Sequence, residues 1–258
     1  MISLNFQIVP EYVIYHAIVN SSPHRLVDGV PPENIVEFQK AAKSKDETAC
    51  DFLNYGVGET NVLASPTIAE VAQRTENFIQ TMKADSTFAS VLKETINSLE
   101  HVRSEWERNL VKTDALISDW TGLPLTGEFR IFLTHPALKQ GHYLGRLKAI
   151  CWANRNTWPN YNTVYLWHEL LHNFMSGGDL EHAIIQLITD NELRIRLNGG
   201  SYPPFEGHPD LSKLMEAVLP HWKSYLAGKE RNINLFIKEM SALPEVEQLK
   251  AHDDRRNQ

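Results

Sequence analysis

The chain has 258 residues, of which 42% are hydrophobic, and its formal net charge is −7. This composition is typical of a globular protein with a sizeable core, and the acidic balance argues against nucleic acid as a partner, because binding a phosphate backbone needs a basic surface. The sequence shows no signal-peptide pattern, no apolar run of about 18 residues and too few cysteines for a disulfide framework, so we expect a cytoplasmic protein without a membrane segment.

The N-terminal part of the chain is predicted to contain strands followed by long helices. Residues 3–19 are rich in β-branched and aromatic side chains, which indicates one or two strands. Ser65 is a typical N-cap residue with Pro66 at the first helical position, and a second apolar stripe at helical spacing begins near Ser86. We interpret residues 65–120 as a helical hairpin packed on the core, with a lid or a partner-binding arm as the alternative.

The hydrophobic period changes after residue 122, which is the predicted domain boundary. Residues 128–136 alternate between apolar and polar side chains and predict a strand, and residues 146–156 predict another. A helix is expected from 179 to about 198, where Asn-Gly-Gly ends it, and a final helix pair follows.

The segment NTVYLWHELLHNFM, at residues 162–175, contains His168, Glu169 and His172. On a helix the two histidines lie one turn apart on one face, so both rings can reach one cation at about 2.0–2.1 Å. Glu169 is rotated by roughly 100° and can reach a water on that metal, which suits a general base. The segment is otherwise apolar, and unpaired buried polar groups cost several kcal/mol. The pattern therefore predicts a zinc site rather than a buried helix with two incidental histidines.

Glu192 is the third zinc ligand that the sequence favours. On a helical wheel it lies between Ile185 and Ile188, within the apolar stripe of its helix. A carboxylate on that face must be neutral, paired with a cation or bound to a metal. Glu181 shares the face, but it lies about three turns away near the helix N-terminus, where the helix dipole explains an acid.

HELLH, followed by the Glu192 of DNELRIRLNGG 20 positions after His172, resembles the gluzincin arrangement of thermolysin-like zinc metallopeptidases. The resemblance is limited to this motif region. It implies that His168, His172 and Glu192 bind one zinc ion, that Glu169 is the base, and that the substrate is a peptide or a protein.

The position four residues after Glu192 differs from the family pattern. Members often carry an acid there, which orients the first histidine, whereas this chain has Arg196. Arginine cannot accept a hydrogen bond from an imidazole. The acceptor for His168 must then be Asp190, Asn191 or a backbone carbonyl.

The expected fold class is α+β, and the resemblance implies its zincin-like part. A zincin-like catalytic domain, with a small sheet, an active-site helix and a Glu-bearing helix, is expected at residues 123–258. A largely helical N-terminal portion, with the strand segment and the helical hairpin, is expected at residues 1–122. One compact unit is the alternative.

The reaction needs a donor that stabilises the developing oxyanion. Tyr202 and His208, in the loop YPPFEGHPD, follow the Glu-bearing helix closely enough to fold back toward the metal. The alternatives are that Tyr202 packs against the core and that His208 lies on the surface.

These observations predict a zinc-dependent metallopeptidase. Glu169 would take a proton from the zinc-bound water and give it to the leaving amine. The alternatives are a zinc hydrolase of a non-peptide amide, or a metalloprotein that has lost catalysis and acts as a regulatory or interaction module. The presence of Glu169 favours an active enzyme.

Overall fold

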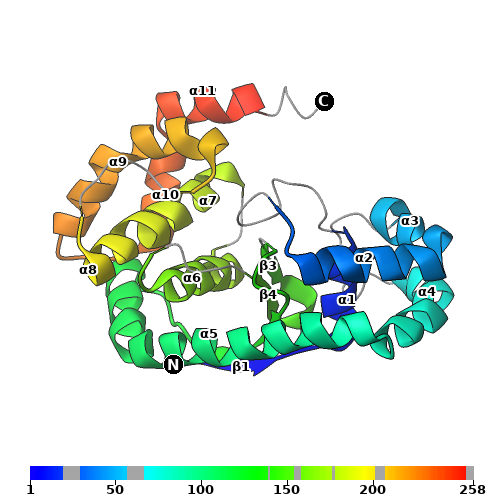
Figure 1. Cartoon of the computed structure of the whole chain (residues 1–258). Helices are drawn as coiled ribbons and strands as arrows, with labels where there is room; N and C mark the ends of the chain where they lie inside the picture. The colour runs from blue at the N-terminus through cyan, green and yellow to red at the C-terminus, as the bar shows by residue number, and fades with distance from the viewer. Residues whose placement is uncertain are drawn as a thin grey trace. The chain divides into compact units, whose positions relative to one another are not determined.

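The computed structural model describes residues 1–19, 30–56, 67–138, 140–153, 158–175, 178–200 and 207–253. The fold is α+β, as expected, with many helices and a small mixed sheet (Figure 1). The chain divides into two compact units. The sheet unit comprises Leu4–Ser104 and Glu128–Asn156, and the motif unit comprises Met1–Ser3, Glu105–Gly127 and Thr157–Gln258. The domain boundary expected at residue 122 stays a prediction.

The sheet unit combines N-terminal helices with a sheet of order β1-β2-β4-β3. β2 and β4 are parallel, and β3 and β4 are antiparallel. The strands predicted at 128–136 and 146–156 are confirmed as β2 and β4, whereas β3 was not predicted. The elements are β1 (Ile2–Gln7), α1 (Pro10–Val19), α2 (Glu33–Lys45), α3 (Glu47–Gly56), α4 (Thr67–Lys83), the first part of α5 (Ser86–Thr121), β2 (Gly127–Leu133), β3 (Gln140–Leu144), the 3-10 helix η2 (Gly145–Leu147) and β4 (Ala149–Ala153).

The N-terminal segment corrects one expectation. The structure confirms one strand within residues 3–19, but a second strand there is wrong, because the chain is helical from Pro10 to Val19. Proline suits the first helical position, where no hydrogen bond from its nitrogen is needed. Nearly every side chain of α1 is buried, so its hydrophobic pattern has no period that separates a helix from a strand.

The helices predicted within residues 65–120 are confirmed as α4 and α5, and Ser65 and Pro66 lie outside the described residues. Apolar side chains of α1 to α4 and of the first turns of α5 form one buried cluster. A smaller cluster joins α1 to the sheet and includes Tyr12, Phe132 and Cys151. In the part of the chain that the structure describes, no helix has the length and apolar character needed to cross a membrane.

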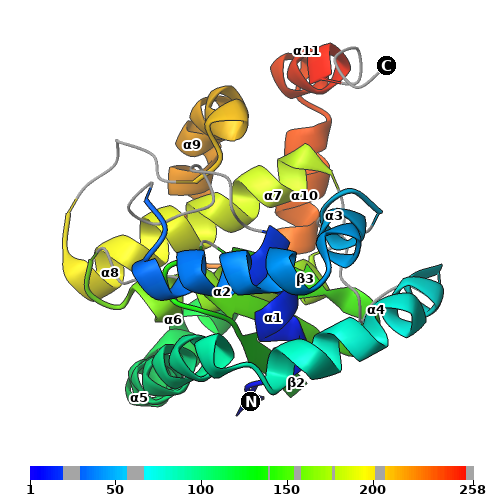
Figure 2. The same cartoon turned by 45° about the vertical axis from the view of Figure 1, so that its right-hand side comes forward.

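The motif unit is helical. It contains the rest of α5, α6 (Tyr161–Phe174), α7 (Asp179–Gln186), the π-helical segment η3 (Leu187–Leu193), α8 (Arg194–Asn198), the 3-10 helix η4 (Pro209–Leu211), α9 (Ser212–Ala227), α10 (Ile233–Ser241) and α11 (Pro244–Asp253). The helix predicted from 179 to about 198 is confirmed as the continuous rod α7–η3–α8, which Figure 2 shows in yellow-green at α7 and yellow at α8. α9, α10 and α11 pack on α7, where the sequence predicted a helix pair.

The helix with the histidine motif, α6, is fixed to α5 at its N-terminal end. Buried Glu105 of α5 accepts hydrogen bonds from the Thr163 backbone N–H at 2.7 Å and from Asn162 Nδ2 at 3.1 Å. The first backbone N–H groups of a helix have no partner within it, and they favour a negative group. One turn later, Trp167 Nε1 donates to Thr113 Oγ1 at 2.7 Å. These bonds determine which face of α6 is presented to α7.

Candidate metal centre

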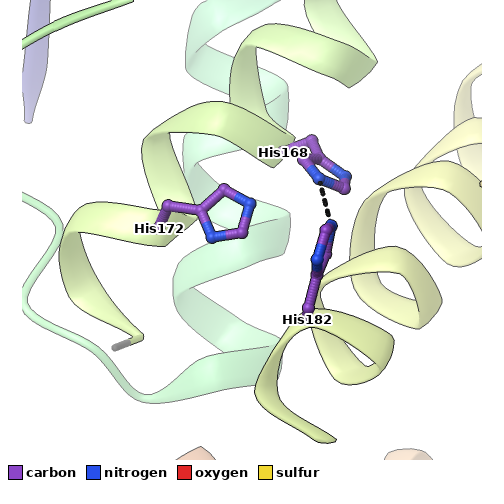
Figure 3. Close-up of side chains that lie close together, drawn as sticks. All are labelled: His168, His172 and His182. Carbon is purple, nitrogen blue, oxygen red and sulfur yellow. Dashed lines mark hydrogen bonds between the residues drawn. The ribbon is translucent and has the colours of Figure 1, made fainter. Parts of the chain in front are cut away.

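Three histidines from two helices point at one another in the motif unit (Figure 3). His168 and His172 project from one face of α6, and His182 comes from the first turn of α7. Their ring centroids are 4.9–5.2 Å apart, and one ring nitrogen of each residue lies within 4.8 Å of the other two. The structure therefore brings together the two predicted histidine ligands and a third that the sequence did not predict.

The closest pair in this trio has a spacing that suits a shared metal ion. His168 Nε2 and His182 Nε2 are 3.2 Å apart. Two nitrogens bound to one tetrahedral zinc ion at about 2.0–2.1 Å lie about 3.3–3.4 Å from each other. Two imidazole lone pairs repel at this distance, so either a proton or a cation must lie between them. A metal ion that displaces this proton leaves both rings almost where they are.

His182 is electrostatically prepared to act as a ligand. Burial, followed by the neighbouring rings of His168, His172 and His208, lowers the pKa of His182 to about 3, against a smaller opposite effect of Asp190. The imidazole is therefore neutral at ordinary pH, and a metal ion binds the neutral form.

Asp190 is the acceptor that orients His168. Its Oδ1 lies 3.2 Å from His168 Nδ1, and both side chains are buried. A carboxylate only accepts, so the proton lies on Nδ1 and Nε2 faces the other histidines. Burial lowers the pKa of His168, but Asp190 and then Glu169 raise it, and the net shift is upward. The Thr189 hydroxyl donates to the same Asp190 oxygen at 3.0 Å. Of the acceptors that the sequence left open, the structure selects Asp190.

Glu169 lies where the motif predicts a base. Its side chain is 9% exposed, and its charge acts on the His168 ring beside it. It follows His168 directly on α6. Its role as the general base stays a prediction.

Glu192 is buried, as predicted, at 5% exposure, but it does not belong to the ligand cluster found among the described residues. Its Oε1 accepts a hydrogen bond from Arg196 Nε at 2.7 Å. Glu192 lies within η3, and a π-helical turn contains more residues than an α-helical turn, so a regular wheel does not fix which neighbours its carboxylate meets. Glu192 as a zinc ligand stays a prediction, and His182 is the better placed third donor.

The predicted oxyanion donors have different outcomes. Tyr202 lies outside the described residues. His208 is exposed, and its ring centroid lies 4.8 Å from that of His182, so the chain after α8 does return to the histidines. Its ring lies beside that of His182, and its role as a donor stays a prediction.

A sequence signal for His182 existed, but it was weak. His182 lies at the start of the helix that follows the motif helix, and the short connection between the two helices keeps this turn close to His172. On a regular wheel it falls about 120° from Ile188, outside the apolar stripe. A search for a ligand on that stripe therefore leads to Glu192.

Comparisons with protein-family models, with curated proteins and with solved structures found no match for this chain. The interpretation of the centre therefore rests on its own geometry and on its motif.

Proposed function

We propose that the protein is a zinc-dependent hydrolase of peptide bonds and that His168, His172 and His182 hold its metal ion. The observation that carries this proposal is the convergence of three imidazole nitrogens within 4.8 Å, on a helix that places Glu169 beside them. Three neutral nitrogen donors with a further open position are the donor set of a catalytic zinc site. Two of these donors are half-buried and one is buried, so the centre is not sealed from solvent.

Each residue has a separate task in this proposal. A bound zinc ion lowers the pKa of a water molecule and polarises a carbonyl group. Glu169 takes the proton from that water and returns it to the leaving amine. Asp190 holds the His168 ring so that Nε2 faces the metal.

The peptide substrate rests on the motif and on its resemblance to thermolysin-like metallopeptidases. A zincin-like domain is part of this proposal, and it is supported by the α+β fold and by two successive helices that supply the donors. The proposed ligand set differs from the gluzincin pattern, because in it a histidine of the following helix takes the place of the glutamate. We therefore propose the reaction class of that family without its ligand set.

A Glu169→Gln variant tests the proposal. General-base catalysis contributes typically 10²–10⁴-fold to a rate, so hydrolysis of a peptide library should fall by about that factor, while zinc content by mass spectrometry should stay at one ion per chain. Glu216→Gln is the matched control, because Glu216 is exposed on α9. If peptides stay intact with a wild-type chain that binds zinc, the peptidase proposal fails, and a non-peptide amide or a binding role replaces it.

A further inference from the structure

His208 lies beside one of the three candidate ligands, His182. Its ring centroid lies 4.8 Å from that of His182, with an angle of 67° between the rings. Within the trio the centroid distances are 4.9–5.2 Å and the angles are 65–77°. The ring of His208 therefore packs edge-on against the ring of His182, at a distance and an angle close to those within the trio.

The backbone before His208 is fitted to α7. Gly207 has φ +121°, and a Cβ atom there would lie 2.6 Å from Gln186 Oε1, so only glycine fits. Gln186 lies one helical turn after His182 on α7, so a chain that touches Gln186 places its next ring at His182. Gln186 is fully buried, and neither polar atom of its side chain has a hydrogen-bond partner among the described residues. This close approach positions His208 beside His182.

We propose that His208 is a fourth ligand that closes the metal centre. This inference rests on the proposed metal site formed by His168, His172 and His182. Zinc sites with four protein ligands are typical of structural metals, whereas catalytic sites keep one position for water. The bound His208 imidazole fills that position, and water enters when the ring leaves.

His208 is suited to leaving the centre because its side chain is exposed, whereas His168 is buried. An exposed ring gives up little buried area when it moves away. The chain thus regulates the same site at which it binds metal, and the closed form is inactive. This role is the opposite of oxyanion stabilisation, in which removal of His208 would slow hydrolysis.

Cobalt in place of zinc provides the test, since its visible absorption reports the number and kind of its ligands. The full chain is loaded with Co²⁺, and azide is added as a small competing ligand. We expect the wild-type spectrum to be insensitive to azide and that of His208→Ala to respond. The metal affinity of His208→Ala should fall by at least about 10-fold. Loss of a residue that only supports a metal ligand already costs about that much, and loss of a ligand should cost more. His221→Ala is the matched control, because it also removes one histidine. His221 lies on α9, and its contact with Glu245 is long, with 4.0 Å between His221 Nε2 and Glu245 Oε1.

A second variant keeps the imidazole and moves the backbone. Gly207→Ala should also make the cobalt spectrum sensitive to azide, because its Cβ atom displaces the chain from Gln186. The proposal is overturned if the wild type responds to azide as strongly as His208→Ala does, or if the wild type binds no metal. It is also overturned if His208→Ala loses hydrolysis with an unchanged spectrum and metal affinity, which would assign the donor role. If the spectra follow the prediction and no variant cleaves a peptide, the fourth ligand stands and the peptidase proposal fails.

Discussion

Asp190→Asn should weaken zinc binding without unfolding the chain. The asparagine fills nearly the same volume, but it removes the negative charge 3.2 Å from His168 Nδ1. It also replaces an ionic acceptor with a neutral one, so His168 becomes a weaker ligand whose ring is less firmly oriented.

The size of the effect follows from the contact. A hydrogen bond to a charged group contributes about 1.5–3 kcal/mol, and about 1.4 kcal/mol corresponds to a tenfold change in an equilibrium constant. Loss of the charge at Asp190 should therefore weaken zinc binding by roughly 10–150-fold. Loss of an indirect partner of a metal site typically costs about 10–100-fold, which agrees with this range. Asp190 is 0% exposed, so solvent does not screen the interaction.

The assay is competition for zinc between the protein and a chelator of known affinity, with circular dichroism as the check on folding. Asp179→Asn is the matched control, since Asp179 is an exposed residue in the first turn of the same helical rod. An Asp190→Asn protein that is folded and binds zinc as tightly as wild type would refute the role of Asp190. An equal loss in Asp179→Asn would show that the effect arises from net charge.

Two further predictions concern stability. The pKa of His182 is near 3 in the folded chain and has an ordinary value of 6.5, so the unfolded chain binds more protons between these values. The urea midpoint of the metal-free protein should fall as the pH falls from 6.5 toward 3, and His182→Gln should show less of this loss. If the urea midpoints of the wild type and His182→Gln depend on pH in the same way, the lowered pKa of His182 is contradicted. Glu105→Ala leaves the Thr163 N–H and Asn162 Nδ2 without their buried acceptor, so it should lower the free energy of unfolding by at least about 1–3 kcal/mol. Glu107→Ala is the control and should not lower it, because Glu107 lies on the exposed face of α5.

The two histidines of the motif could be predicted from sequence because their relation is local. Positions i and i+4 share a face on any α-helix, whatever packs around it. The structure confirms this relation for His168 and His172 on α6. The burial of Glu192 could also be predicted from sequence, because the apolar stripe around it determines which side of the helix is buried.

The third histidine could not be predicted in the same way, because it depends on two features that a regular wheel lacks. One is the packing of the first turn of α7 against α6, which brings His182 to the motif. The other is the π-helical segment that contains Asp190 and Glu192, in which Asp190 lies at His168. π-helical segments are rare and occur frequently at functional sites, and a regular wheel does not represent one.

The central claim is that one zinc ion is held by His168, His172 and His182. The most direct test is a zinc titration of the wild type, His182→Ala and Glu192→Gln. We predict one ion per chain in the wild type, wild-type affinity in Glu192→Gln, and at least about 10-fold weaker binding in His182→Ala. Full binding by His182→Ala, together with loss of zinc in Glu192→Gln, would contradict the claim and restore the glutamate as the third ligand.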